Sequence, residues 1–214
     1  MLTVWGRKTA ASVQAVMWCI GEVDQAYQRE DAELRFGSTD SPDFRAYSPC
    51  GTIPVVFDGG SDPLWEPSAI MRYLAGRYGR PPFWPEEGLK RAAVDKWAEW
   101  GRGQVAQMFT GPIFGHLIRT PPSQHRPVAL ARAMTAFNRL LDIADLQFAK
   151  NTYLTGNDFT LADIQFGHIL YRYFELPIER LNRPGLKRYY DLLTERPAFR
   201  EHVMVSYEEL RARD

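Results

Sequence analysis

Over the first eighty residues, the spacing of apolar positions switches repeatedly between the two-residue period of strands and the longer period of helices. Residues 2–5 predict a buried strand, and the apolar positions of residues 13–23 predict a helix that begins near Ser12. The pattern then indicates a strand around 26–31, a loop over 33–43, a helical turn at 44–47, strands at 53–57 and 64–65, and a helix that opens at 66–68. The predicted order is therefore β-α-β-α-β-β-α.

Beyond residue 88 the pattern is helical throughout. Apolar residues at positions 130, 134, 137, 141, 144 and 148 recur in steps of four and three, which predicts one helix with a strong buried stripe. The first long helix of this part is expected to kink or end at Gly111–Pro112. We therefore predict an α/β domain over residues 1–80, a linker over 81–88 and an all-helical domain over 89–214.

The segment from residue 48 to 74 carries two features that suggest a binding site. Pro54 stands where a strand begins; a cis bond there would turn the backbone carbonyl and amide of Ile53 outward, whereas a trans proline on an edge strand is the plain alternative. The helix start just after the short strand exposes N–H groups that bind carboxylates, unless Ser68 simply caps it. Together these features suggest a site for a short peptide-like ligand with a free carboxylate.

Four sequence segments carry a resemblance to a known family. GTIPVV at 51–56 and WEPSAIMRYL at 65–74 resemble the glutathione-binding half of bacterial cytosolic glutathione S-transferases. LTGNDFTLADI at 154–164 and YYDLLTERPAF at 189–199 resemble the helical domain of the same family. The resemblance implies a thioredoxin-like βαβαββα domain followed by a helical bundle, with glutathione as co-substrate, a homodimer and a role in detoxification.

The chemistry implied by the resemblance requires a donor to the glutathione sulfur. A free thiol with a pKa near ~8.5 is only a few per cent ionised at neutral pH, so the enzyme must stabilise the thiolate. In this family the donor comes from the loop before the first helix, and the usual serine falls on Ala10. Thr9 and Ser12 are therefore our candidate catalytic residues, although Ser12 could instead be the N-cap of that helix.

The resemblance also implies which residues bind glutathione and which form the wall for the second substrate. The glutathione-binding candidates are Thr52, Ile53, Pro54, Glu66, Pro67 and Ser68. Pro67 departs from the family's usual serine and offers neither N–H nor hydroxyl, so Ser68 and the next N–H would have to compensate. The wall candidates are Trp97, Trp100, Met108, Phe109, Phe114 and Tyr171. Because Ala10 and Pro67 depart from the pattern, a noncatalytic binding or interaction protein remains an alternative. A glutathione-dependent peroxidase is a further alternative, because it needs the same thiolate.

Composition and spacing exclude other classes. With 26 basic and 26 acidic residues and no basic tract, we expect no nucleic-acid partner. The four histidines lack ligand spacing, so we expect no metal. The two cysteines lack metal spacing, and the pattern shows no signal peptide or membrane span, so we expect the protein in the cytoplasm.

Thr160 and Asp163 are expected to form a capping box with a structural role.

Overall fold

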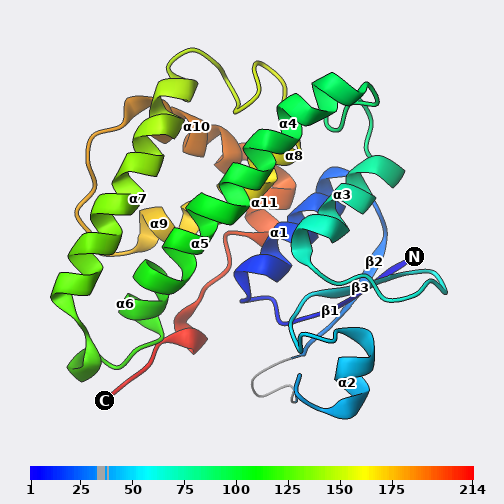
Figure 1. Cartoon of the computed structure of the whole chain (residues 1–214), viewed down its shortest axis with the longest axis horizontal. Helices are drawn as coiled ribbons and strands as arrows, with labels where there is room; N and C mark the ends of the chain where they lie inside the picture. Colours follow the sequence, from blue (N-terminus) through cyan, green and yellow to red (C-terminus); the bar gives the residue numbers. More distant parts are fainter. Residues whose placement is uncertain (33–36, 38) are drawn as a thin grey trace.

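The computed structural model describes residues 1–32, 37 and 39–214, so the loop expected over 33–43 lies partly outside the described residues. The N-terminal elements follow the predicted order, except that the strand predicted at 64–65 is not formed. They are β1 (Leu2–Trp5), α1 (Ala11–Glu22), β2 (Tyr27–Glu30), α2 (Pro42–Tyr47), β3 (Val55–Asp58) and α3 (Pro67–Arg77). In Figure 1 they lie to one side of the molecule, with the helical remainder on the other.

The sheet has the strand order β2-β1-β3, with β1 parallel to β2 and antiparallel to β3. The strand predicted at 64–65 is wrong as an element: it is reduced to one antiparallel bridge between Leu64 and Val56. Its neighbours explain why. Pro63 has no N–H to extend the ladder, and Glu66 adopts a positive φ that turns the chain into α3.

The helical part begins with one continuous helical stretch from residue 88 to 118. The elements are α4 (Gly88–Trp100), η2 (Gly101–Ala106), α5 (Gln107–Phe109), η3 (Thr110–Gly115), α6 (His116–Ile118), η4 (Pro122–Gln124), α7 (Pro127–Phe148), α8 (Leu161–Gly167), α9 (Leu170–Glu175), α10 (Pro184–Glu195), α11 (Pro197–His202) and η5 (Glu208–Leu210). Gly111–Pro112 does not end the helix, because the chain widens there into the π-turn η3. A π-turn re-pairs the backbone and so tolerates a proline that an α-helix would not.

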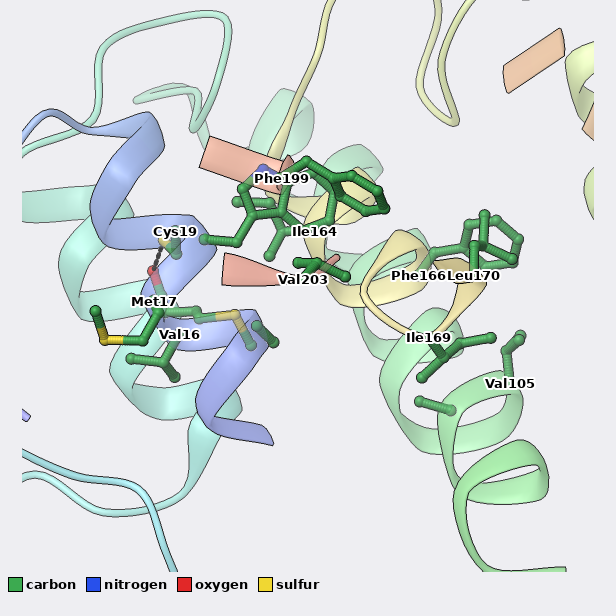
Figure 2. Packing of buried hydrophobic residues seen from close by; sticks show 14 of the residues in the cluster. Val16, Met17, Cys19, Val105, Ile164, Phe166, Ile169, Leu170, Phe199 and Val203 are labelled. Atoms are coloured by element: carbon green, nitrogen blue, oxygen red, sulfur yellow. Dashed lines mark hydrogen bonds between the residues drawn. The ribbon is translucent and has the colours of Figure 1, made fainter. Parts of the chain in front are cut away.

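The core is continuous between the two parts of the chain. The stripe predicted on α7 is confirmed at four of its six positions, since Phe137, Leu141, Ala144 and Phe148 are buried, whereas Leu130 and Met134 are half-buried against the core. In Figure 2, side chains of α1 face those of α8 and α11, among them Ile164 of α8 and Phe199 of α11. Helix α1 thus packs against the C-terminal helices as well as its own sheet.

The capping box at the start of α8 is also confirmed. One carboxylate oxygen of Asp163 accepts from the Thr160 N–H at 2.8 Å and from its hydroxyl at 3.1 Å. The other accepts from the Leu154 N–H and the Tyr189 hydroxyl, so the buried side chain also ties α8 to α10.

Among the described residues, the helices are all too short or too polar to cross a bilayer.

Candidate active site

A cleft of about 410 Å³ lies where the start of α1 faces the long helical stretch. It is lined by Arg7, Thr9, Ala10, Ala11, Ser12, Thr52, Ile53, Arg102, Ala106, Gln107, Thr110, Gly111, Phe114, Arg119, Arg172 and Leu210. Both catalytic candidates, Thr9 and Ser12, therefore lie in one cleft with Thr52 and Ile53.

The hydroxyl of Thr9 is buried, and its single hydrogen is engaged. The side chain is 1% exposed. It accepts a hydrogen bond from the Arg7 guanidinium at 2.7 Å and donates its own hydrogen to the carboxylate of Glu209. Because a threonine hydroxyl has a single hydrogen, Thr9 would have to release Glu209 before it could donate to a sulfur.

Ser12 lies in the first turn of α1 and is not the helix N-cap. That position belongs to Ala10, which makes no side-chain capping bond. The Ser12 hydroxyl donates instead to the Ile53 carbonyl at 3.1 Å. The N-terminal end of α1, with its uncapped N–H groups and positive dipole end, is therefore part of the cleft wall.

Of the remaining glutathione-binding candidates, Glu66, Pro67 and Ser68 stand at the start of α3 and do not line the cleft. The Ile53–Pro54 bond is cis, and Ile53 lines the cleft. Glu66 is an exposed residue with φ 68°, which a side chain rarely adopts. Pro67 occupies the first position of α3, where a backbone N–H would have no partner within the helix. The Ser68 hydroxyl donates to the side-chain oxygen of Gln165 on α8 at 3.0 Å.

Comparisons with known proteins identify the family. The family model "Glutathione S-transferase, N-terminal domain" matches residues 1–76, and "Glutathione S-transferase, C-terminal domain" matches residues 102–197. The chain is 34% identical over 206 residues to glutathione S-transferase GstB of Escherichia coli (strain K12), covering 96% of this chain and 99% of that protein. This chain belongs to the glutathione S-transferase family.

A solved relative agrees in fold. The theta class glutathione S-transferase from Xanthomonas axonopodis pv. citri, with glutathione bound, has a TM-score of 0.89 at 36% identity and covers 96% of this chain and 98% of its own. Glutathione S-transferase 3 of Zea mays is 28% identical over 218 residues, with 94% of this chain and 93% of that protein covered.

Of the six wall candidates in this glutathione S-transferase, Phe114 lines the cleft. Phe109 lies behind it in the core, against Phe137 and the ring of Tyr173. Trp100 stacks on Phe166 with ring centroids 5.7 Å apart, and Trp97 packs edge-on against Trp100. Met108 and Tyr171 are half-buried against the core, and neither contributes to the cleft lining.

Three arginines of the cleft were missed by sequence reasoning: Arg102, Arg119 and Arg172. For Arg102 a signal was present, since residues 102, 106, 110 and 114 share helical spacing with the candidate Phe114. The place of Arg172 in the cleft depends on tertiary packing, since its guanidinium donates at 2.7 Å to the carbonyl of Thr9, which is 163 positions away along the chain.

The pKa values of two arginines of the cleft are lowered, mainly by burial. Burial, together with the charges of Arg7 and Arg119, lowers the pKa of Arg172 to about 10, so this side chain is still cationic at neutral pH. Burial also lowers the pKa of Arg102, against the opposing attraction of Glu66 and Glu99. The described residues include no group of three or more His, Cys, Asp or Glu side chains that could hold a metal ion, and the absence of a metal stays a prediction.

Proposed function

We propose that this glutathione S-transferase adds the sulfur of glutathione to a small electrophile in the cleft beside α1. The observation that carries the proposal is the meeting of Ser12, the N-terminal end of α1 and the Ile53 backbone in one cleft. A relative 36% identical to this chain has been solved with glutathione bound, which supports the same ligand here.

In this proposal Ser12, and not Thr9, donates to the sulfur. The Ser12 hydroxyl contacts only a neutral carbonyl, which is a weaker acceptor than a thiolate, so the hydrogen can be redirected at small cost. The Thr9 hydrogen is committed to a carboxylate. The positive end of α1 adds to the stabilisation of the anion, as a helix N-terminus does for other anions.

The ends of glutathione would be held around α3. The Ile53 carbonyl keeps a second lone pair for the ligand's backbone, because Ser12 uses only one. Glu66 would pair with the α-amino group, and its strained backbone is consistent with a site that keeps this residue for binding. The γ-glutamyl carboxylate would accept from the N–H groups of Ser68 and Ala69 in the first turn of α3, since the Ser68 hydroxyl is held by Gln165.

The test compares Ser12→Ala with Thr9→Val. Glutathione binding is measured by calorimetry, the pKa of the bound thiol by ultraviolet absorbance of the thiolate, and turnover with a chloronitrobenzene. We expect Ser12→Ala to raise the pKa of the bound thiol and to lower kcat/KM by about ten- to a hundredfold, because one of several anion donors is lost. Thr9→Val should lower stability while the thiol pKa stays near that of the wild type.

The outcomes separate the alternatives. A raised thiol pKa in Thr9→Val alone would assign the donor to Thr9. Glutathione binding without turnover of any electrophile would favour the noncatalytic binding protein, which the missing hydroxyl at Ala10 already suggests. Turnover of a hydroperoxide in place of electrophiles would favour the peroxidase.

We propose further that the protein acts as a cytoplasmic homodimer in detoxification. Membership of the family and the balance of 26 basic and 26 acidic residues support self-association. The exposed free thiol of Cys50 fits a reducing compartment. Sedimentation that finds only monomer would remove the dimer.

A further inference from the structure

The cleft described above is rich in positive charge. Four of its lining residues are arginines, and among the described residues that line it none is acidic. The nearby carboxylate of Glu209 accepts the hydrogen of Thr9. A pocket that had evolved only for neutral, apolar electrophiles would gain nothing from several guanidinium groups that repel one another.

The arginines differ in how their charge is balanced. Arg102 feels the attraction of Glu66 and Glu99, which places it towards the start of α3 and the proposed glutathione end. Arg172 donates from one nitrogen to the Thr9 carbonyl at 2.7 Å and to the Gln14 side chain at 3.0 Å, and both acceptors are neutral. Its Nε is buried and has no hydrogen-bond partner among the described residues.

Arg172 lies beside a candidate of the second-substrate wall, and Arg119 lies near Arg172. The Arg172 guanidinium lies over the Phe114 ring at 4.6 Å, and Phe114 is the wall candidate that lines the cleft. Arg119 is exposed at the C-terminal end of α6 and is close enough to Arg172 to repel its charge. Within the described part of the chain, no carboxylate lies within ion-pair distance of either guanidinium.

We infer that Arg119 and Arg172 form an anion-binding subsite in the second-substrate half of the cleft, and that the preferred electrophile is a small molecule carrying a carboxylate. This inference rests on the proposed transfer function. A carboxylate bound there pairs with the exposed fork of Arg119 and offsets the buried charge of Arg172, while the apolar body of the substrate contacts Phe114.

The group transfer is an ordinary substitution. The thiol proton of glutathione passes to solvent, and the thiolate forms a bond from sulfur to the electrophilic carbon. The leaving group, a halide in the probe below, departs with the electron pair of its bond to that carbon. The carboxylate takes no part in bond changes and serves only to hold the substrate.

The test uses two electrophiles that react by the same chemistry and differ in one charge: 4-chloro-3-nitrobenzoate and its methyl ester. For each, kcat/KM at saturating glutathione is divided by the rate constant of the uncatalysed reaction with glutathione. We expect this normalised value to favour the carboxylate in the wild type by about tenfold or more. Arg119→Met should lower the ratio of carboxylate to ester by about tenfold, and Arg119→Lys by less, because the charge remains without the fork.

The matched control is Arg132→Met, which removes an equal charge from an exposed position on α7. Its ratio should equal that of the wild type, and an equal fall there would mean general electrostatic attraction instead of a subsite. Arg119 is preferred to Arg172 for mutation because Arg172 also holds the loop before α1.

Two results would overturn the inference and leave the proposed function standing. One is a wild type that turns over the ester as well as, or better than, the carboxylate. The other is an Arg119→Met variant with an unchanged ratio and a raised KM for glutathione, which would assign Arg119 to glutathione's own carboxylates. Failure to turn over either probe, or any neutral electrophile, would instead remove the transfer function itself.

Discussion

His168 predicts a measurable dependence of stability on pH. The side chain is 1% exposed and lies at the end of α8. Its Nδ1 lies 3.1 Å from the Ile164 carbonyl, to which the neutral ring donates, and its Nε2 has no hydrogen-bond partner among the described residues. Burial, with the charges of Arg102 and Arg172, lowers the pKa of His168 to about 3.

The sign and size of the effect follow from proton linkage. In the unfolded chain the histidine has a pKa near ~6.5, so between about pH 3 and 6.5 the unfolded state binds the extra proton and the free energy of unfolding falls as the pH falls. From about pH 7.5 to about pH 5 this loss is about 2 kcal/mol. Asp163 acts in the opposite direction over part of this range, because burial raises its pKa to about 6 and protonation there favours the folded state.

The assay must therefore compare two proteins. Urea unfolding followed by tryptophan fluorescence, at about pH 7.5 and about pH 5, gives the free energy of unfolding for the wild type and for His168→Asn. Asparagine keeps an N–H donor for the Ile164 carbonyl and does not titrate, while Asp163 is common to both proteins. We expect the wild type to lose about 2 kcal/mol more than the variant. Equal losses in the two proteins would refute a buried, neutral His168.

Two further predictions concern backbone positions. A Cβ on Gly101 would lie 2.9 Å from the backbone nitrogen of Phe166, whereas at Gly103 the nearest atom is the Glu99 carboxylate at 3.8 Å. Gly101→Ala should lower the free energy of unfolding by about 1–3 kcal/mol, and Gly103→Ala should raise it by less than about 1 kcal/mol; similar effects in urea unfolding would contradict this packing. Glu66→Gly should raise the free energy of unfolding by about 1 kcal/mol, because it relieves the positive φ, and should weaken glutathione binding. Glu66→Gln should only weaken glutathione binding. Calorimetry that finds wild-type glutathione affinity in Glu66→Gln would remove Glu66 from the site.

Local patterns predicted those parts of the fold whose neighbours in space are also neighbours in sequence. The buried stripe of α7 and the capping box of Thr160 and Asp163 depend on spacings of three and four residues. The capping box was predicted correctly, as were four of the six positions of the stripe. The strand at 64–65 failed because one apolar pair cannot form a ladder between Pro63 and the turned backbone of Glu66. The helix was expected to kink or end at Gly111–Pro112 and does not end there, because a π-turn, which leaves no distinctive sequence pattern, continues it.

The candidate site was predictable mainly on the side proposed for glutathione, with Phe114 as the one wall candidate that lines the cleft among the described residues. Ile53 and Ser12 were found through motifs within short segments, and the structure brings them together at 3.1 Å. The opposite side is assembled from the long helical stretch, α9 and the C-terminal tail, and their meeting depends on tertiary packing. Aromatic residues on the same helices suggested a wall, but most of them are used in the core, as the stacking of Trp100 on Phe166 shows.

The position of Arg172 explains why the two sides cannot vary independently. Its guanidinium holds the Thr9 carbonyl and the Gln14 side chain, so the loop that presents the start of α1 to the cleft is anchored from α9. The Thr9 hydroxyl in turn binds Glu209 of the C-terminal tail, and Leu210 of that tail lines the same cleft. A replacement of Arg172 would leave the Thr9 carbonyl and the Gln14 side-chain oxygen without this donor. Because buried acceptors without a donor are costly, the replacement would loosen the loop that carries the proposed thiolate site. The charge that we assign to electrophile binding is therefore also part of the support for the glutathione site, which is a physical reason for one residue to serve both.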